Sequence, residues 1–263
     1  MLEDRNLVPL TEDEMIPYRG SGIAMVFQDP MTSLDPTMTI GKQITEGIIL
    51  HEGVTKQEAK ERAIHLLTEV GIENPEKRFK QYPHQLSGGM RQRVVIAIAL
   101  AADPDILICD EPTTALDVTI QAQILELINK LKAERNLSVI FITHDLGVVA
   151  SLSNRISVMY GGLIMEEGLT DEIFYAPKHP YTRSLFNSIP QMNSENEKLK
   201  VIQGMVPSLI NLPRTGCRVA SRIPWVESHL HEEDPQLHEI SSGHFVRCTC
   251  WKHFQFEGEE GGK

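Results

Sequence analysis

The chain has 263 residues, a formal net charge of −11 and a sequence pI near 5.4. This acidic balance argues against binding to DNA or RNA, because no basic face would meet the phosphate charges. The longest apolar run, Val94–Ala102, has about half of the ~20 residues that a membrane span requires. Four cysteines, three of them near the end of the chain, do not form a disulfide framework. No signal peptide is expected.

A short helix and a buried strand are expected near the beginning of the chain. Thr11–Glu14 fits a capping box, which predicts a helix over Glu12–Tyr18. The apolar run Ile23–Phe27 then predicts a buried strand, and Gln28 follows at its carboxyl end. Taken alone, a glutamine in this position is more often an ordinary loop residue than a functional one.

The next region is mainly helical. The apolar pattern predicts a helix from Gly41 to about Gly71, which serves as a C-cap. A second helix is expected after Ser87, Gly88 and Gly89. Backbone N–H groups and the helix dipole at such a start favour an anion, and the serine hydroxyl adds a donor. A flexible turn before a helix is the alternative interpretation.

The most informative stretch is Ile106–Asp117. Its apolar beginning predicts a strand buried on both faces, and this strand ends on Asp110 and Glu111 before a proline stops it. Carboxylates in this position lie where open α/β sheets bind ligands. One acid can hold Mg²⁺ through water, and the other can activate a water for attack on phosphorus. An exposed acidic turn is the alternative for this stretch taken alone.

A third apolar strand, Val139–Thr143, ends on His144. A single histidine at a strand end is usually structural. Here it is the third polar group delivered by a buried strand, after Gln28 and the acidic pair Asp110–Glu111. Because the carboxyl ends of parallel strands share one edge, these groups are expected to converge in one site at the top of the sheet.

The rest of the chain is less regular. A hairpin is predicted from Arg155–Tyr160 and Leu163–Glu167, joined by two glycines, and a further helix begins near His179. The composition becomes more polar after residue 190, where we place a domain boundary. The tail Glu257–Lys263 is charged and rich in glycine, and it is expected to be disordered.

Five motifs in this order resemble those of the ATP-binding subunits of ABC transporters. They are the Q-loop Phe27–Pro30, the signature Leu86–Met90, the Walker B strand Ile106–Glu111, the D-loop Ala115–Asp117 and the switch histidine in Thr143–Asp145. Three further segments resemble the oligopeptide and dipeptide importer branch, namely Asp29–Leu34, His179–Thr182 and Gly204–Leu209. Together with the five motifs, these segments span some two-thirds of the chain.

The resemblance implies an α/β fold of the P-loop-NTPase (RecA-like) type, with a mostly parallel sheet and a helical ABC signature subdomain at about residues 41–100. Residues 1–190 would form the ABC ATPase domain, and residues 191–263 an irregular C-terminal extension of the peptide-importer type. ATP and Mg²⁺ are the implied cofactors. The implied partners are a second ABC ATP-binding subunit, transmembrane permease subunits and, indirectly, a peptide-binding protein, with no nucleic acid. The chain would lie in the cytoplasm, peripherally on the inner face of the cytoplasmic membrane through the permease subunits.

The resemblance also implies a role for each residue at the strand ends. Glu111 would be the general base or orient the attacking water, and His144 would contact the γ-phosphate. Asp110 and Gln28 would hold Mg²⁺.

Four other residues would act toward a second subunit. The resemblance implies that Ser87, Gly88 and Gly89 bind the γ-phosphate of the ATP held by that subunit, and that Asp117 links the two nucleotide sites. The segment of residues 41–85 would hold the groove for a permease coupling helix.

One family motif has no match in the 263 residues: the phosphate-binding P-loop, Gly-x-x-x-x-Gly-Lys-Ser/Thr. Gly41–Lys42 has Pro36 where the first glycine belongs and Gln43 where the hydroxyl belongs. In the family, the P-loop and the strands before it precede the region that matches Met1. We therefore expect a chain that lacks roughly its first 80–100 residues, judged from a typical domain of this kind. The P-loop cradles the β- and γ-phosphates and supplies a Mg²⁺ ligand.

The resulting functional hypothesis is an ATP-binding and ATP-hydrolysing subunit that energises import of oligopeptides or dipeptides, impaired in this form because the P-loop is absent. The alternative is a non-catalytic ABC module that contributes its signature motif to a paired ATPase subunit. An ABC-type ATPase of DNA maintenance is disfavoured by the acidic charge and by the peptide-branch segments.

The cysteines depart from the family pattern. The family extension commonly carries four cysteines that resemble an iron–sulfur ligand set. Cys217 and Cys248 match the outer two, but Ile223 and Leu230 stand where the middle two belong, and Cys250 adds a Cys-x-Cys pair. We expect reduced thiols and no iron–sulfur cluster, although three nearby cysteines can bind a metal loosely.

Overall fold

The computed structural model describes residues 2, 5–114, 116–188, 201–202, 204–208 and 210–256. The chain divides into two compact units, Met1–Leu152 and Ser153–Lys263. The boundary predicted near residue 190 and the polar segment after it lie outside the described residues, as does the tail after residue 256. The domain boundary near residue 190 stays a prediction. The division into compact units falls earlier in the chain, between Leu152 and Ser153.

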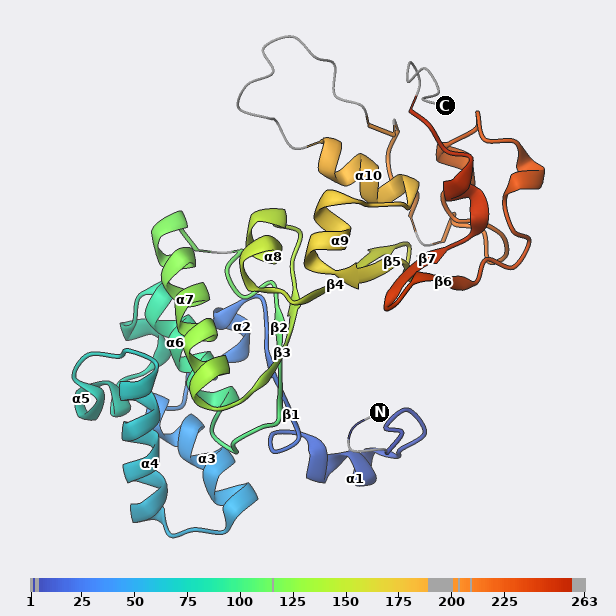
Figure 1. Ribbon diagram of the computed structural model, residues 1–263. Helices are drawn as coiled ribbons and strands as arrows, with labels where there is room; N and C mark the ends of the chain where they lie inside the picture. The colour runs from blue at the N-terminus through green and yellow to red at the C-terminus, as the bar shows by residue number, and fades with distance from the viewer. Residues whose placement is uncertain are drawn as a thin grey trace. The chain divides into compact units, whose positions relative to one another are not determined.

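The first unit is built on a three-stranded parallel sheet. Its strands are β1 (Ile23–Val26), β2 (Ile106–Asp110) and β3 (Ser138–Ile142), which lie side by side in chain order (Figure 1). Ile23 pairs with Ile106, and Ile106 pairs with Ser138. Because all three strands run in the same direction, the residues that follow them meet at one edge. The predicted α/β fold with a parallel sheet is confirmed.

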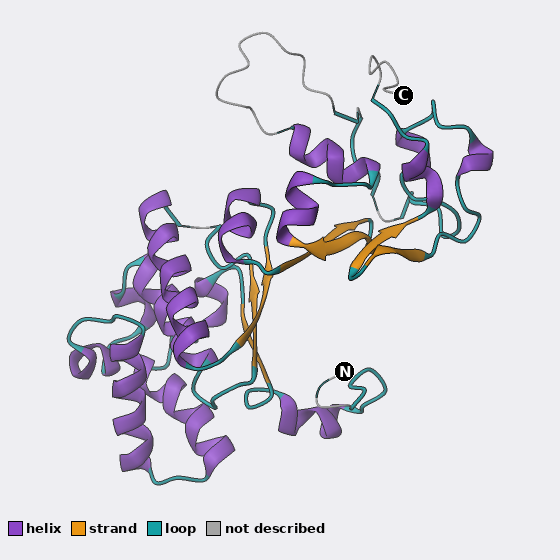
Figure 2. Ribbon diagram, viewed as in Figure 1, coloured by secondary structure: helices purple, strands orange, loops and turns teal. Residues whose placement is uncertain are grey.

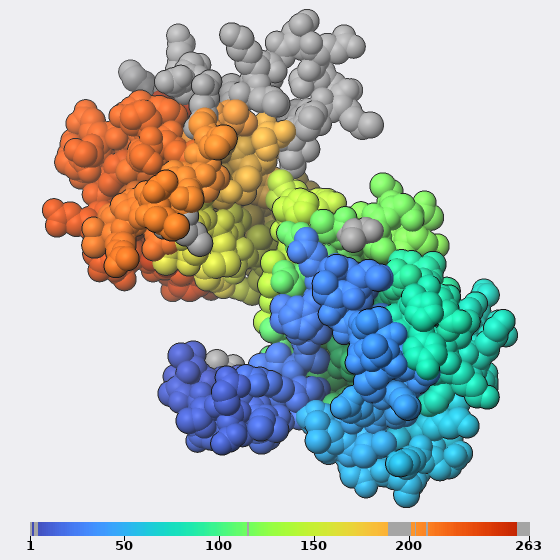
Figure 3. Space-filling model, turned by 180° about the vertical axis from the view of Figure 1, so that it is seen from behind, coloured from blue at the N-terminus to red at the C-terminus, as the bar shows by residue number. Residues whose placement is uncertain are grey.

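Most helices of the first unit lie on one side of this sheet (Figure 2). They are α1 (Glu12–Met15), α2 (Pro30–Ser33), α3 (Ile40–Glu52), α4 (Lys56–Glu69), α5 (Pro75–Phe79), α6 (Gly88–Ala99), α7 (Val118–Glu134) and α8 (Leu146–Leu152), with short 3₁₀ turns η1 (Ile16–Tyr18) and η2 (Pro83–Gln85). Helices α3 and α4 form a contiguous lobe in light blue and cyan in the space-filling view (Figure 3). Among the described residues, no helix combines the length and the apolar character needed to cross a membrane.

The helical pattern predicted from Gly41 to Gly71 is confirmed, and the structure divides it into two helices. Helix α3 ends at Gly53, whose φ of 64° is left-handed and therefore suits a residue without a Cβ. Helix α4 begins after Thr55, whose hydroxyl and backbone form a capping box with Glu58. The apolar pattern continues across this turn, which is why sequence periodicity alone joined the two helices.

The sheet of the first unit is buried on one face only. Ala24, Val26, Leu107 and Cys109 on that face belong to a core that also includes the apolar sides of α3, α4, α6 and α7. On the other face, Phe27, Ile140 and Ile142 are 52%, 51% and 46% exposed. The prediction of strands buried on both faces is therefore wrong for this structure. We refer to Phe27, Ile140 and Ile142 as the exposed sheet face.

The second unit contains a four-stranded antiparallel sheet in the order β4–β5–β7–β6. The strands are β4 (Arg155–Tyr160), β5 (Leu163–Leu169), β6 (Leu237–Ser241) and β7 (His244–Arg247). Helices α9 (Thr170–Tyr175) and α10 (Pro180–Asn187) and 3₁₀ turns η3 (Ala220–Arg222), η4 (Ser228–Leu230) and η5 (Thr249–Lys252) complete it. The predicted hairpin is confirmed, and its two glycines, Gly161 and Gly162, both have positive φ. Strands β6 and β7 were not predicted.

A buried carboxylate organises the second unit. Glu166 in β5 is fully buried and accepts hydrogen bonds from the backbone N–H groups of Lys178 (2.7 Å) and His179 (3.0 Å). The Nε2 atom of His244 in β7 lies 2.8 Å from the same carboxylate. His179 in turn caps α10 by accepting from the N–H of Tyr181 at 3.1 Å. Burial lowers the pKa of His179 to about 3, so its ring is neutral. The predicted helix start at His179 is confirmed.

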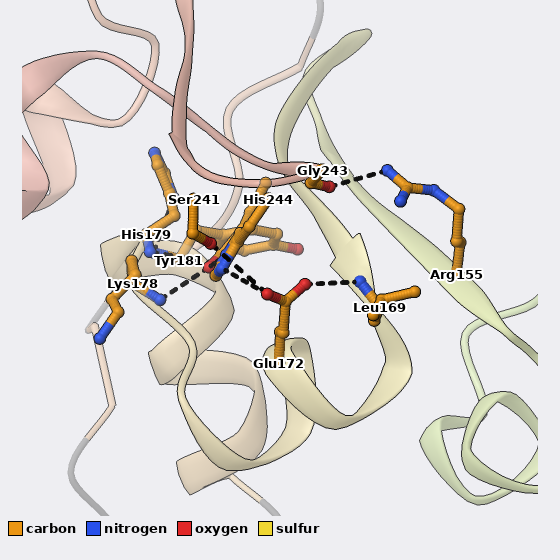
Figure 4. A network of polar contacts seen from close by, with 10 residues as sticks. Arg155, Leu169, Glu172, Lys178, His179, Tyr181, Ser241, Gly243 and His244 are labelled. Carbon is orange, nitrogen blue, oxygen red and sulfur yellow. Dashed lines mark hydrogen bonds and ion pairs between the residues drawn. The ribbon is translucent and has the colours of Figure 1, made fainter.

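A second carboxylate lies on the other side of His244 (Figure 4). Glu172 accepts from the N–H of Leu169 at 3.0 Å at the start of α9, and its other oxygen lies 3.9 Å from His244 Nδ1. Arg155 of β4 donates to the carbonyl of Gly243 at 2.9 Å in the turn before β7. These contacts join segments on both sides of residue 190 into one polar network.

Candidate functional site

Glu111 is positioned by the strand ladder of the first unit. It follows β2 directly, and its N–H donates to the carbonyl of Ile142 at the end of β3 at 2.9 Å. Its φ of 44° is left-handed, which is uncommon for a residue with a side chain and occurs at functional sites. Pro112 then ends the strand. The ladder and the turn together hold the side chain at the carboxyl edge of the sheet.

Residues from all three strand ends meet at this carboxylate. Gln28 Nε2 donates to Glu111 Oε2 at 3.0 Å, and His144 Nδ1 lies 3.0 Å from Oε1. The structure thus brings together Gln28, Glu111 and His144, as expected from the convergence of the strands. Thr114 Oγ also donates to Glu111 Oε2, at 3.0 Å. Sequence reasoning missed Thr114. Its hydroxyl comes three residues after Glu111, in the turn that begins with Pro112, and this spacing could have indicated the contact.

The contacts around Glu111 favour its ionised form. Its pKa lies below the usual value, chiefly through the hydrogen bond with His144 and then through that from Thr114, while burial acts in the opposite direction. The His144 side chain is 71% exposed, so the site is open to solvent. The carboxylate is thus held in one orientation beside solvent, where it can accept a hydrogen bond from a water molecule.

Asp110 and Gln28 remain the predicted Mg²⁺ ligands. Asp110 ends β2, and Gln28 uses its amide nitrogen on Glu111, which leaves its amide oxygen as an acceptor. A carboxylate oxygen and an amide oxygen are the hard donors that Mg²⁺ prefers, so the two residues fit this ion. The described hydrogen bonds join Gln28 to Glu111 rather than to Asp110. A shared ion between Asp110 and Gln28 stays a prediction.

The helix start at the signature segment is well formed. Ser87 is the N-cap of α6 and its Oγ accepts from the N–H of Met90 at 3.3 Å, so its own hydrogen remains available to a ligand. Gly88 and Gly89 open the first turn, where backbone N–H groups have no partner within the helix. A Cβ on Gly89 would lie 2.7 Å from Ile120 Cγ2, so close packing against α7 requires glycine here.

Asp117 lies beside this helix start. It is the N-cap of α7, and its Oδ1 accepts from the N–H of Ile120 at 3.0 Å. Ile120 is the residue that packs on Gly89, and Leu116 lies next to the position of Gly88. The predicted signature and D-loop residues therefore adjoin each other, with Ala115 outside the described residues. Within the described residues, no hydrogen bond connects Ser87–Gly89 to the cluster around Glu111, and the assignment of these residues to a second subunit's ATP stays a prediction.

Comparison with known proteins agrees with this geometry. A family model for ABC transporters matches residues 4–114, and a model for the C-terminal region of oligopeptide/dipeptide transporters matches residues 165–228. The oligopeptide transport ATP-binding protein OppD of Bacillus subtilis is 54% identical over 248 residues, covering 94% of this chain and 69% of the relative. The dipeptide transport ATP-binding protein DppD of Lactococcus lactis subsp. cremoris is 52% identical over 248 residues, covering 94% of this chain and 71% of the relative.

Solved structures show the same likeness. The dimeric, post-hydrolysis ATP-binding cassette MJ0796, bound to ADP and Pi, aligns with a TM-score of 0.55 and 32% identity, covering 62% of this chain and 68% of that chain. A cassette from Clostridium perfringens, cbiO1 of the cbiONQ transporter complex, aligns with a TM-score of 0.56 and 29% identity, covering 63% of this chain and 64% of that one. The chain therefore belongs to the ATP-binding subunits of ABC transporters, in their oligopeptide and dipeptide branch.

Proposed function

We propose that the chain supplies the water-orienting part of an ATP-binding and ATP-hydrolysing subunit that energises import of oligopeptides or dipeptides across the cytoplasmic membrane. The observation that carries this proposal is the carboxylate of Glu111, held at 3.0 Å by groups from the ends of two neighbouring parallel strands. Such a carboxylate at the top of the sheet is placed to orient a water toward a terminal phosphate. The likeness to OppD and DppD supports peptides as the transported cargo.

In this proposal each residue has one task. Glu111 accepts a hydrogen bond from the attacking water, and His144 uses its Nε2 atom on the γ-phosphate while Nδ1 remains with Glu111. Bound Mg²⁺ would neutralise phosphate charge, with Asp110 and Gln28 as its holders. The helix start at Ser87 binds the γ-phosphate of ATP carried by a second ABC subunit.

The partners follow from the same proposal. A second ATP-binding subunit faces the start of α6, and Asp117 connects the two nucleotide sites. Permease subunits dock through a coupling helix on the helical segment of residues 41–85, which places the chain on the inner face of the membrane. A peptide-binding protein acts on the far side of the permease and has no direct contact with the chain.

Transport can be tested in a hybrid protein. Residues of this chain replace the aligned 248-residue region of Bacillus subtilis OppD, with which it shares 54% identity. We expect the hybrid to restore uptake of a labelled oligopeptide to cells that lack OppD, since the remainder of OppD supplies the P-loop. Unmodified OppD is the positive control. A hybrid that accumulates normally and hydrolyses ATP, yet restores no uptake, would show that peptide import is the wrong assignment.

The alternative function is a non-catalytic module that lends its signature segment to a paired ATPase. One observation favours it: the helix start at Ser87 is intact, and the hydrogen of the Ser87 hydroxyl is available to a ligand. Both proposals predict that the isolated chain binds ATP negligibly, because the phosphate cradle is absent. Equilibrium dialysis with labelled ATP and Mg²⁺ measures this. Micromolar ATP binding by the isolated chain would contradict the expectation that these residues cannot hold ATP without a P-loop.

A further inference from the structure

The second unit gathers three thiols and an imidazole at one point. The ligand atoms of Cys217, His231, Cys248 and Cys250 all lie within 4.8 Å of one another. They come from separate segments: Cys217 precedes η3, His231 follows η4, and the Cys-x-Cys pair connects β7 to η5. All three cysteines are buried and none forms a disulfide. Sequence reasoning identified the cysteines as a loose group and missed the histidine.

His231 gives an independent indication of a ligand. Its Nδ1 and Nε2 atoms are both buried, and neither has a hydrogen-bond partner. Burial of a polar group without a partner is costly, so such groups are nearly always satisfied by protein, water or an ion. The imidazole that lacks partners is the one that lies among the three sulfur atoms. A metal ion bonded to one ring nitrogen would remove this cost.

A backbone N–H group also points to one of the sulfur atoms. The N–H of Glu232 donates to Cys248 Sγ at 3.4 Å. Hydrogen bonds to the ligand atoms are the second layer of contacts that orients thiolates around a metal. This contact therefore holds the Cys248 sulfur in place beside His231, the residue that precedes Glu232.

We propose that Cys217, His231, Cys248 and Cys250 form a tetrahedral site for a single Zn²⁺ ion. Zinc prefers three or four sulfur and nitrogen ligands, and a Cys₃His set is a common structural site. With Zn–S bonds of about 2.3 Å, tetrahedral geometry places sulfur atoms about 3.8 Å apart. The observed spread of up to 4.8 Å requires only a small inward movement.

An iron–sulfur cluster fits these residues less well. Each ligand of a four-iron cluster binds a different iron atom, so its ligand atoms must stand farther apart than around one ion. The middle positions of the family's cysteine pattern are occupied by Ile223, which is fully buried among apolar residues, and by Leu230. The chain has therefore exchanged two cluster ligands for His231 and Cys250, and the new set encloses a smaller space.

The proposed ion would act as a structural staple. The described residues between 201 and 236 contain only short 3₁₀ turns. The apolar cluster that includes their Val219, Ile223 and Val226 also includes Phe254. A Zn²⁺ ion would tie this irregular segment to the β6–β7 hairpin through both cysteines of the Cys-x-Cys pair. Metal-binding free energy then adds to folding free energy, as in other small metal-stapled units.

Metal content and coordination test the proposal on the full chain, independently of ATP hydrolysis. The reduced chain is loaded with ZnCl₂, desalted and measured by plasma mass spectrometry and zinc-edge X-ray absorption. We expect one zinc per chain, with three sulfur ligands and one nitrogen ligand. No retained zinc, or a coordination shell without sulfur, would overturn the site. Iron and inorganic sulfide in the protein purified from iron-supplied cells would favour the family's cluster instead and would overturn it equally.

Two matched variants test the histidine. His231→Asn is expected to weaken zinc affinity at least tenfold in competition with a chromogenic chelator, the range that loss of a metal contact produces. His229→Asn, at an exposed histidine two residues away, should leave zinc affinity unchanged. Equal affinity in the two variants would remove His231 from the site. Should His231→Asn not fold, the nitrogen ligand in the X-ray absorption of the unchanged protein decides the same question.

Discussion

Replacing Glu111 with glutamine is expected to lower ATP turnover at least a hundredfold, within the range found for loss of a positioned acid–base group. The amide has the size and the hydrogen-bonding reach of the carboxylate, so contacts with Gln28 and Thr114 can persist in part. It has no negative charge with which to orient or deprotonate water, and it loses the charge-assisted contact with His144. ATP binding should change little, because the phosphate cradle is untouched. Turnover is measured on the purified OppD hybrid with its permease subunits.

The matched control is Glu126→Gln, which makes the same change of charge on the exposed side of α7. This variant should retain normal turnover. Single-turnover measurements with bound ATP separate a defect in chemistry from a defect in binding. If the Glu111→Gln hybrid retained more than half of its turnover, another residue would have to orient the water, and the assignment of Glu111 would be wrong.

The second large effect concerns stability. Glu166→Gln is expected to destabilise the second unit by about 2–4 kcal/mol, because a buried donor that loses its acceptor costs about 1–3 kcal/mol. The backbone N–H of Lys178 donates to one carboxylate oxygen of Glu166, and the backbone N–H of His179 donates to the other. An amide supplies only one acceptor oxygen, so its NH₂ group must face one of these N–H donors, and the contact with His244 Nε2 is altered as well. The start of α10 and strand β7 should therefore both loosen.

Tryptophan fluorescence reports this change directly, because both tryptophans, Trp225 and Trp251, belong to the second unit. Urea unfolding of the zinc-saturated chain gives the free energy difference. The control is Glu167→Gln on the same strand, where a half-exposed ion pair with Arg155 is worth at most about 1 kcal/mol. Equal shifts of the urea midpoint in the two variants would show that Glu166 has no special structural role.

The convergence at Glu111 was predictable because it depends on few assumptions. Three short apolar runs, each followed by a polar residue, give three strands, and parallel strands place their carboxyl ends on one edge. The order β1–β2–β3 is also the order in the chain, so no strand had to be placed out of sequence order. Thr114 was missed because its contact depends on the geometry of the turn after Pro112, which the apolar pattern does not encode.

Other features depend on contacts that a sequence pattern does not describe. An uninterrupted apolar run predicts a strand that is buried on both faces. Whether a second layer covers the sheet depends on other segments of the chain. In this structure, the side chains of Ile140 and Ile142 are about half exposed to solvent. The pairing of β7 with β5 joins residues nearly 80 positions apart, as Glu166 and Val246 show. Leu230 stands where the family has a cysteine ligand, and His231 follows it directly. Comparison with the family motif therefore drew attention to Leu230 and not to His231.

The exposed sheet face makes tolerance to substitution uneven within a few residues of the same sheet. A polar residue at Ile140 or Ile142 would meet water and should cost little folding free energy in this chain. The same residue at Leu107, on the neighbouring strand but fully buried, would place an unsatisfied group in the core. In the isolated chain, Ile140 and Ile142 should therefore accept polar residues, whereas the opposite face should stay apolar. A library of variants sorted for folded protein would show this difference as alternating permissive and restrictive positions along β2 and β3.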